Sequence, residues 1–330
     1  MSLLASIDVG SNTLRLLIGR VEDNRLTTVF SARKITRLGN RVDQTGKLQD
    51  ENIETSISAL KEFSSVIEKY GIRQVKAVAT SALREAANAD IFINRVFRAT
   101  GISIEVIPGE KEAELTLKGV LPAFPDAGRT SPPLLPSLLR GGTEGLFILD
   151  IGGGSTEWIL CRDEDHIAMG SIPIGVIKLT QHFLKTDPIS KPDLNNLNGK
   201  IVPIIEDLKK RIGHLINRYT RFIGTAGTFT TIAAIDLSLV SYSRERIHLH
   251  GISFTKLQNM AEKLLALSLE ERKKMKGLEP ERADLIIPGI QFTIKIMESL
   301  KFDELTISDY GLLEGVLLDI AKNISETGES

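Results

Sequence analysis

Several features that define specialised classes of protein are scarce in this sequence. Only one of the 330 residues is a cysteine, Cys161, which excludes an internal disulfide and is typical of a reducing compartment. No run approaches the roughly 18 apolar residues of a membrane span, and the N-terminus lacks the basic and apolar regions of a signal peptide. We therefore expect a cytoplasmic protein without a membrane partner.

Aromatic residues and net charge are also low. Phe, Trp and Tyr make up 5% of the chain and form no apparent cluster, so the sequence shows no signature of nucleobase stacking. The net charge of −1 gives no long-range attraction for a polyanion, and an anionic substrate would need locally concentrated positive charge. We expect no nucleic-acid partner. The length and the 42% hydrophobic fraction predict a globular protein large enough for two domains.

The stretch Asp150–Glu157 carries the strongest local signal. Three glycines, Gly152, Gly153 and Gly154, lie between an apolar strand and a second apolar strand that starts near Trp158. Such a turn lets the backbone approach a ligand closely, and its exposed N–H groups suit a phosphate. Carboxylates beside a phosphate repel it unless a cation lies between them, so Asp150 and Glu157 are candidate magnesium ligands.

A second copy of this pattern begins at Asp8. An apolar strand leads into Asp8-Val-Gly-Ser-Asn-Thr13, and a returning strand carries Arg15. In both halves another strand follows at a similar distance and ends at a Thr-rich turn, at Thr80 in one and Thr225 in the other. A repeat of this length indicates a duplicated domain. The helix predicted after Thr80 carries Arg84 one turn in, where a helix dipole and a cation both favour an anion.

Seven motifs together resemble a known family, the exopolyphosphatase and guanosine pentaphosphate phosphohydrolase family within the actin-like ATPase and sugar kinase superfamily. They cover nearly the whole chain and occur in the family's order, which makes the set far more specific than any one motif. The motifs are Asp8–Thr13, Ala79–Arg84, Pro108–Ala113, Asp150–Glu157, Gly224–Thr228, Arg282–Gly289 and Ser308–Leu312.

The resemblance implies an α/β fold with two duplicated, ribonuclease-H-like (actin-like ATPase) domains flanking a central cleft. Residues 1–121 would form the first domain, with the C-terminal helix 312–330 packing back on it, and residues 146–311 would form the second. The intervening 122–145 is rich in Pro, Gly, Leu and Ser and is predicted to be a flexible linker.

The resemblance also implies roles for individual residues. Only the alignment with the family singles out Glu112 as catalytic base, since acids in a first helical turn are equally expected from capping. Arg84 would neutralise the phosphoryl group, and Asp150 and Glu157 would hold Mg²⁺ or another divalent cation. The residues expected at the phosphates are Asp8, Ser11, Asn12, Arg15, Gly152, Gly153, Gly154, Ser155 and Arg282.

Three functions remain open from the sequence. The first is an exopolyphosphatase that releases terminal phosphate from inorganic polyphosphate, and the second is a phosphohydrolase acting on guanosine pentaphosphate. The third is a catalytically weak regulator that binds a guanosine alarmone or nucleotide, because Glu114 and Leu313 occupy positions where family members commonly have arginine. A homodimer is a further expectation from the resemblance.

Overall fold

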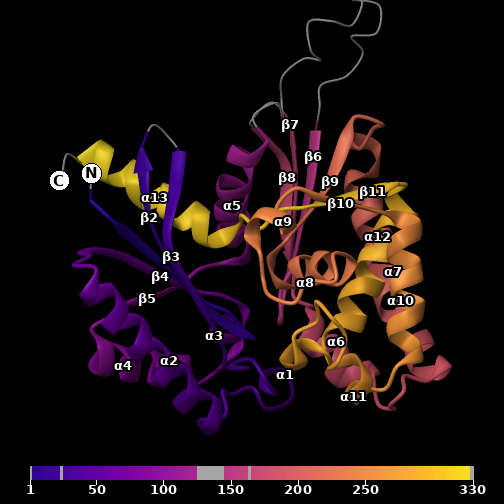
Figure 1. The fold of residues 1–330 in the computed structure, drawn as a ribbon, viewed down its shortest axis with the longest axis horizontal. Helices are drawn as coiled ribbons and strands as arrows, with labels where there is room; N and C mark the ends of the chain where they lie inside the picture. The colour runs from indigo at the N-terminus through magenta and orange to yellow at the C-terminus, as the bar shows by residue number, and fades with distance from the viewer. Residues whose placement is uncertain (1, 23–24, 125–144, 163–164, 328–330) are drawn as a thin grey trace, which may run out of the picture. The chain divides into compact units, whose positions relative to one another are not determined.

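The computed structural model describes residues 2–22, 25–124, 145–162 and 165–327 (Figure 1). The chain forms two compact units, each with its own β-sheet. Unit 1 comprises residues 1–122, 152–155 and 310–330, and unit 2 comprises 123–151 and 156–309. The α/β fold with two domains is therefore as predicted. The linker predicted over 122–145 lies, for residues 125–144, outside the described part of the chain.

The sheet of unit 1 has five strands in the order β3-β2-β1-β4-β5. Strands β1, β2 and β3 form an antiparallel meander. Strand β4 is parallel to β1, and β5 is parallel to β4. Every residue of β1 is buried, because helices cover the sheet. The bounds are β1 Leu4–Val9, β2 Thr13–Glu22, β3 Arg25–Ile35, β4 Gln74–Ala79 and β5 Ile104–Val106.

Two groups of helices pack on this sheet. The first contains α2 and α4. The apolar residues of α2 recur at helical spacing and are buried, whereas α4 was not predicted from the sequence. The second contains α5 and α13, which lie together in Figure 1. The bounds are α1 Val42–Thr45, α2 Asp50–Lys69, α3 Ser81–Glu85, α4 Ala89–Thr100, α5 Gly109–Val120 and α13 Leu312–Thr327. A short 3₁₀ helix, Leu121–Ala123, follows α5.

Helices α5 and α13 approach each other closely through glycines. A Cβ added to Gly119 would lie 1.9 Å from the carbonyl oxygen of Gly311, and one added to Gly315 would lie 1.8 Å from that of Leu115. Only glycine allows this backbone contact. The segment that ends the described chain therefore covers the helix that carries Glu112.

The sheet of unit 2 has six strands in the order β10-β11-β9-β6-β7-β8. Strands β6 to β8 form a second meander, and β9 and β11 continue the sheet in parallel, with β10 as an added antiparallel edge strand. The bounds are β6 Gly145–Ile151, β7 Thr156–Arg162, β8 Asp165–Ile172, β9 Thr220–Thr225, β10 His250–Ser253 and β11 Glu304–Ile307.

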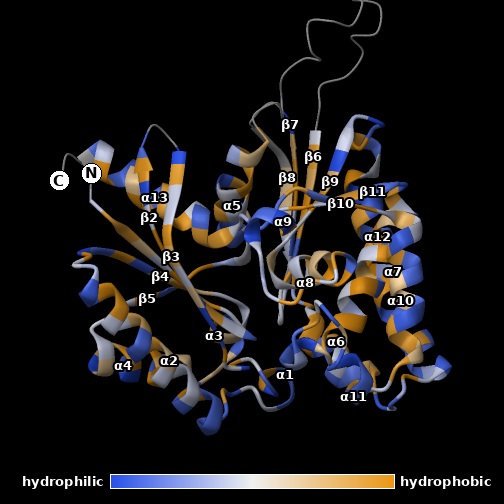
Figure 2. Cartoon of the chain, in the orientation of Figure 1, coloured by the Kyte–Doolittle hydropathy of each residue, from blue (hydrophilic) through white to orange (hydrophobic). Residues whose placement is uncertain are grey.

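The helices of unit 2 enclose a large apolar core. Trp158, Phe147 and Phe222 are among its largest fully buried side chains. Figure 2 shows both hydrophilic and hydrophobic colours along α7 and α10, as expected for helices with one buried face. The helices are α6 Val176–Phe183, α7 Lys191–Ile212, α8 Ala226–Asp236, α9 Arg244–Ile247, α10 Phe254–Ala266, α11 Leu269–Arg272 and α12 Ile286–Leu300, with 3₁₀ turns Gly213–Leu215 and Pro280–Arg282.

Two further predictions can be compared with the structure. Cys161 is a buried residue of β7, and burial raises the pKa of its thiol to about 11. Among the helices in the described ranges, none has both the length and the apolarity to cross a membrane.

The predicted internal repeat is visible in the sheets. Taken from its other edge, the sheet of unit 2 runs β8-β7-β6-β9-β11-β10. Its first five strands match β3-β2-β1-β4-β5 of unit 1 in direction and connection. One equivalence inferred from spacing was wrong: Asp150 lies in register with Thr225, whereas Asp8 lies in register with Val78. Thr80 follows β4 and is therefore two positions beyond the counterpart of Thr225.

Candidate functional site

The two glycine hairpins have the same local geometry. In unit 1 the Gly10 N–H donates to the carbonyl oxygen of Thr13 at 3.2 Å, and the Gly152 N–H donates to that of Ser155 at 3.0 Å. The residue opposite Asp8 is Arg15, and the residue opposite Asp150 is Glu157. Directly opposed residues of an antiparallel pair share one face of the sheet, with Cβ atoms about 5 Å apart. The duplicated scaffold thus carries different chemistry in its two copies.

In unit 1, Asp8 lies against a cation. Its Oδ2 accepts hydrogen bonds from Arg15 Nη2 at 2.7 Å and Nε at 2.9 Å, and the Asp8 side chain is buried. Arg33 on β3 is the register partner of Arg15, which places a second cation one strand further on. Within the described residues, Asp8 Oδ1 has no hydrogen-bond partner. Asp8 therefore holds Arg15 in place, next to a second arginine on β3.

In unit 2, the corresponding row is acidic. Thr225, Asp150, Glu157 and Ser171 lie in register on the adjacent strands β9, β6, β7 and β8. Asp150 is 6% exposed, Glu157 is fully buried, and the Ser171 hydroxyl donates to Glu157 Oε1 at 2.6 Å. Two opposed carboxylates repel each other unless a cation lies nearby.

This donor set suits magnesium. Carboxylate oxygens are hard ligands, and Mg²⁺ is commonly bound by one or two of them while water and substrate phosphates complete its shell. The part of the chain that is described contains no group of three or more His, Cys, Asp and Glu side chains arranged to hold a metal. Asp150 and Glu157 have the oxygen donors that such an ion takes.

The glycine turn of residues 152–155 groups with unit 1 and touches its hydroxyls. A Cβ added to Gly154 would lie 2.3 Å from Ser81 Oγ and 2.9 Å from Ser11 Oγ, so a larger residue would displace one of them. Ser11, Ser81 and Ser155 are all buried. Hydroxyls and turn N–H groups gathered in this way can donate hydrogen bonds to phosphate oxygens.

Arg84 links the predicted base to this turn. Its Nη1 donates to Glu112 Oε2 at 2.7 Å and to the carbonyl oxygen of Ile107 at 2.9 Å, while its Nη2 donates to Ser155 Oγ at 3.2 Å. Glu112 lies in the first turn of α5 and is 7% exposed. The structure thus brings together Glu112, Arg84 and Ser155, which are far apart in the sequence.

Asn12 shapes the other hairpin through its backbone. Its carbonyl oxygen accepts from the N–H groups of Thr36 and Arg37, both at 3.0 Å. Its Oδ1 is buried and lacks a hydrogen-bond partner among the residues described. Arg37 has a φ of 52°, which is uncommon for a residue other than glycine, so the loop holds this cation beside the turn against a backbone preference. Nothing in the sequence pattern singles out Arg37.

Arg282 lies within unit 2 at the N-terminus of α8. A Cβ added to Gly227 would be 2.1 Å from Arg282 Nη1, so the guanidinium rests on the glycine backbone. Arg282 Nε also donates to Glu279 Oε2 at 3.1 Å. Because α8 starts directly after Thr225, the helix dipole and Arg282 both place positive potential near the acidic row.

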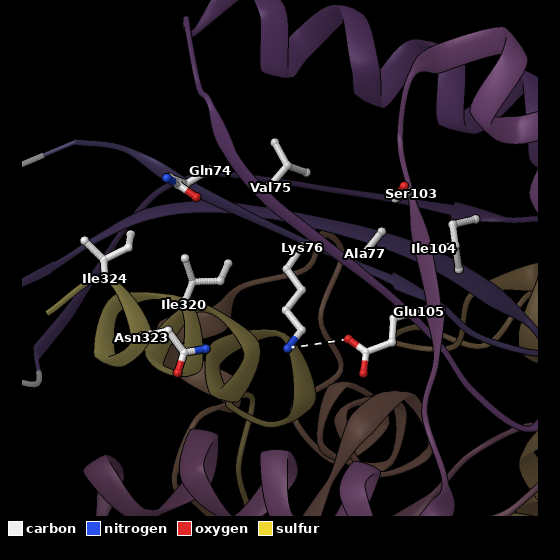
Figure 3. Close-up of a pocket in the computed structure, with 10 residues that line it drawn as sticks. All are labelled: Gln74, Val75, Lys76, Ala77, Ser103, Ile104, Glu105, Ile320, Asn323 and Ile324. Carbon is white, nitrogen blue, oxygen red and sulfur yellow. Dashed lines mark ion pairs between the residues drawn. The ribbon is translucent and has the colours of Figure 1, made fainter. Parts of the chain in front are cut away.

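A pocket in unit 1 lies away from these residues. It has a volume of about 480 Å³ between β4, β5 and α13, and Figure 3 shows Lys76 inside it with its Nζ 3.6 Å from Glu105 Oε2. Ile104, Ile320 and Ile324 form apolar walls. None of the predicted site residues lines it.

Comparison with known proteins decides the family. The model of the Ppx/GppA phosphatase family matches residues 17–131 and 137–324. The chain belongs to this family. Its predicted membership is therefore confirmed, and with it the prediction of a phosphatase.

Several Ppx/GppA relatives match along the whole chain. Exopolyphosphatase 2 of Mycobacterium tuberculosis is 29% identical over 96% of this chain and 98% of its own length. The bifunctional 3-dehydroquinate synthase/phosphatase of Fusobacterium nucleatum is 31% identical over 97% of this chain, which spans only 47% of that protein. A guanosine-5'-triphosphate,3'-diphosphate pyrophosphatase of Photobacterium profundum is 26% identical over 96% of this chain, which spans 59% of that protein.

Solved structures of Ppx/GppA proteins share the fold. The Aquifex aeolicus family member is 31% identical, has a TM-score of 0.75, and is matched over 100% of this chain and 99% of its own. An exopolyphosphatase from Cytophaga hutchinsonii is 26% identical with a TM-score of 0.83, and 98% of both chains is covered. The predicted fold class is confirmed by these likenesses together with the two sheets.

Glu114 and Leu313, at positions where the resemblance implies arginine, have defined surroundings in unit 1. Glu114 pairs with Lys111 at 3.0 Å and with Lys118 at 2.9 Å. Burial alone would raise the pKa of Glu114, but the hydrogen bonds from Lys118 and Lys111 outweigh burial and hold it below its usual value. Leu313 is buried in an apolar cluster on α13. Glu114 is thus balanced by two cations, and Leu313 contributes to packing.

Proposed function

We propose that this protein is a cytoplasmic phosphohydrolase that uses water to release the terminal phosphate of inorganic polyphosphate. The observation that carries the proposal is the in-register carboxylate pair Asp150 and Glu157, which flanks the glycine turn 152–155. Exopolyphosphatase 2 of Mycobacterium tuberculosis, which is matched over nearly its full length, supports polyphosphate as the first substrate to test.

The mechanism begins with phosphate binding. The N–H groups and hydroxyls of the turn 152–155, with Ser11 and Asn12, would donate to the terminal phosphate. Arg15 is held by Asp8, and the Arg282 guanidinium lies against Gly227 in the first turn of α8. Both would contact phosphates further along the polyphosphate. Phosphoryl transfer depends mainly on such positioning and charge neutralisation. A Mg²⁺ ion held by Asp150 and Glu157 would neutralise charge on the phosphate oxygens.

Glu112 would then act as general base. It would accept a proton from the attacking water, while Arg84 holds the Glu112 carboxylate through one guanidinium nitrogen and reaches Ser155 through the other. Because the Arg84 guanidinium contacts both Glu112 and the glycine turn, it would fix the distance between the base and the bound phosphate. Positioned general bases typically contribute 10²- to 10⁴-fold to the rate.

A second candidate substrate is guanosine pentaphosphate. The pyrophosphatase of Photobacterium profundum, named for a guanosine substrate, matches 96% of this chain and is the observation that favours it. A regulator that binds the alarmone without efficient hydrolysis is the third possibility. The chain spans 59% of the length of that relative.

One experiment separates these functions. Phosphate release from short polyphosphate, long polyphosphate and guanosine pentaphosphate is measured with Mg²⁺ for the wild type, Glu112→Gln and Glu110→Gln. Glu110 is an exposed acid in the same helical turn and serves as the matched control. We expect Glu112→Gln to lose about 10²- to 10⁴-fold in kcat and Glu110→Gln to retain wild-type activity.

The outcomes decide between the alternatives. Release from one substrate identifies the preference of the enzyme. If the wild type releases phosphate from none of the three but binds guanosine pentaphosphate in calorimetry, the protein is a regulator. Equal loss in both variants would show that Glu112 is not the base. Sedimentation of the same samples tests the expected homodimer.

A further inference from the structure

Glu157 is held by a residue from the next strand. Strand β8 lies on the outer side of β7, and Ser171 is the register partner of Glu157. The Ser171 hydroxyl donates to Glu157 Oε1 at 2.6 Å, which is within the range of a strong, charge-assisted hydrogen bond. Glu157 is fully buried, so this bond fixes its carboxylate where solvent does not reach.

A serine opposite Glu157 binds the carboxylate without a charge of its own. A hydroxyl supplies one donor and fills only one of about four acceptor positions of a carboxylate, without adding a charge. In unit 1 the residue at the matching register position is Arg33, next to Arg15. An arginine beside Glu157 would neutralise the acid and compete with a metal ion. Serine orients the carboxylate and leaves its negative charge in place.

The strand pairing sets this contact. A register shift lies between Leu160 and Cys161, so the β7 residues from Thr156 to Leu160 keep one register with β8 and those after it take another. The register before the shift places Ser171 opposite Glu157. Moving the pairing by a single residue would turn the Ser171 side chain to the other face of the sheet.

We propose that Ser171 is a positioning residue for the divalent cation, acting through Glu157. This inference rests on the proposed function, because the cation belongs to that site. Residues that hydrogen-bond to metal ligands orient them, and their loss typically lowers metal affinity 10- to 100-fold. Ser171 thereby sets the concentration of cation at which the enzyme is active, without touching the substrate.

The test measures cation binding directly. Mn²⁺ binding to the full chain without substrate is followed by electron paramagnetic resonance for the wild type, Ser171→Ala and Ser171→Thr. We expect about 10- to 100-fold weaker binding for Ser171→Ala and near-wild-type binding for Ser171→Thr, which keeps the hydroxyl. The Mg²⁺ concentration for half-maximal phosphate release should rise by the same factor in Ser171→Ala, with kcat at saturating Mg²⁺ little changed.

Thr220→Val is the matched control. Thr220 is a buried hydroxyl residue of β9 at the opposite end of the same sheet, where it accepts from the Asn217 N–H. Its loss should change thermal stability without changing Mn²⁺ affinity. Thermal melts in EDTA verify that each variant is folded.

Failure of the inference differs from failure of the proposed function. Unchanged Mn²⁺ affinity in folded Ser171→Ala would overturn the role of Ser171 while leaving hydrolysis by the wild type intact. A wild type that binds no Mn²⁺ would overturn it as well. A wild type that binds Mn²⁺ in a Ser171-dependent way but releases no phosphate would instead remove the proposed function.

Discussion

The two hairpins of this protein have one backbone design and opposite electrostatics. In both, an aspartate ends a buried strand, a glycine N–H closes the turn, and a charged residue returns opposite the aspartate. In unit 1 that residue is Arg15, followed in register by Arg33, whereas in unit 2 it is Glu157, followed by Ser171. The acid of the first hairpin thus lies opposite a cation, and the acid of the second lies opposite another acid.

The difference shows how a duplicated scaffold can divide the work of phosphoryl transfer. A polyphosphate needs cations around its oxygens and a metal between phosphate and protein acids. In the proposed function, arginines of unit 1 would provide the first and the carboxylate pair of unit 2 would hold the second. A single substitution at the position opposite the aspartate distinguishes the two roles.

Glu157→Arg is the substitution expected to have the largest effect on the difference between the two hairpins. This substitution gives the second hairpin the pairing of the first, since an arginine opposite Asp150 would neutralise it as Arg15 neutralises Asp8. We expect loss of cation-dependent phosphate release by about 10³-fold, or about 4 kcal/mol in activation free energy. Phosphate release is measured across a Mg²⁺ titration, with Glu157→Gln as the isosteric control. Retained activation by Mg²⁺ would contradict the assignment of Glu157.

The reverse test removes the counter-charge of the first hairpin. Arg15→Gln leaves the buried Asp8 without its two short hydrogen bonds from the guanidinium. We expect unfolding in urea to become easier by about 2 kcal/mol, because a buried charged acceptor loses its donor. The double variant Asp8→Asn with Arg15→Gln should recover part of this loss. If the single and double variants are equally stable, the ion pair does not hold this hairpin.

The smallest expected effect concerns acid sensitivity of unit 1. Asp319 on α13 pairs with Lys118 at 2.9 Å and Lys76 at 3.2 Å. Burial alone would raise the pKa of Asp319, but hydrogen bonds from Lys118 and Lys76 outweigh it and hold the pKa below its usual value. Its contribution is therefore present above the unfolded pKa of about 4 and is lost as the pH falls through the folded value.

Asp319→Asn measures this contribution. We expect the variant to be less stable than the wild type by about 1 kcal/mol or less at pH 7, since the lysines are partly exposed. The difference should shrink as the pH falls below 4. A difference independent of pH would mean that Asp319 stabilises α13 through packing rather than charge. The Lys200→Gln variant on α7 of unit 2 provides a surface-charge control.

Much of the fold was predictable because its signals are local. The helical spacing of Ile53, Ile57 and Leu60 predicts α2, and the glycine turns predict both hairpins with their acids. The seven motifs predict the family. Helix α4 and strand β10 were not predicted, since short amphipathic segments give weak periodic signals.

The sequence yields candidate site residues one by one, but not the contacts between them. The roles given to Glu112, Arg84 and Arg282 remain predictions, while their contacts with Ser155, Ile107 and Gly227 depend on chain crossings that no local pattern encodes. Ser171 was missed because its place opposite Glu157 depends on the register of β7 with β8 and on the shift after Leu160. Spacing also misassigned Thr80, because a similar distance along the chain does not fix the register of the strand that follows.

The glycine contact between α5 and α13 has a consequence for how the protein is made. Translation produces α5 early, but Gly311 and Gly315 leave the ribosome only after all of unit 2 has been synthesised. Until then α5, which carries Glu112, cannot pack against α13, and its apolar face stays uncovered. Packing of α5 against α13 is therefore a late event in biosynthesis, so a nascent chain interrupted before α13 has an incomplete first unit.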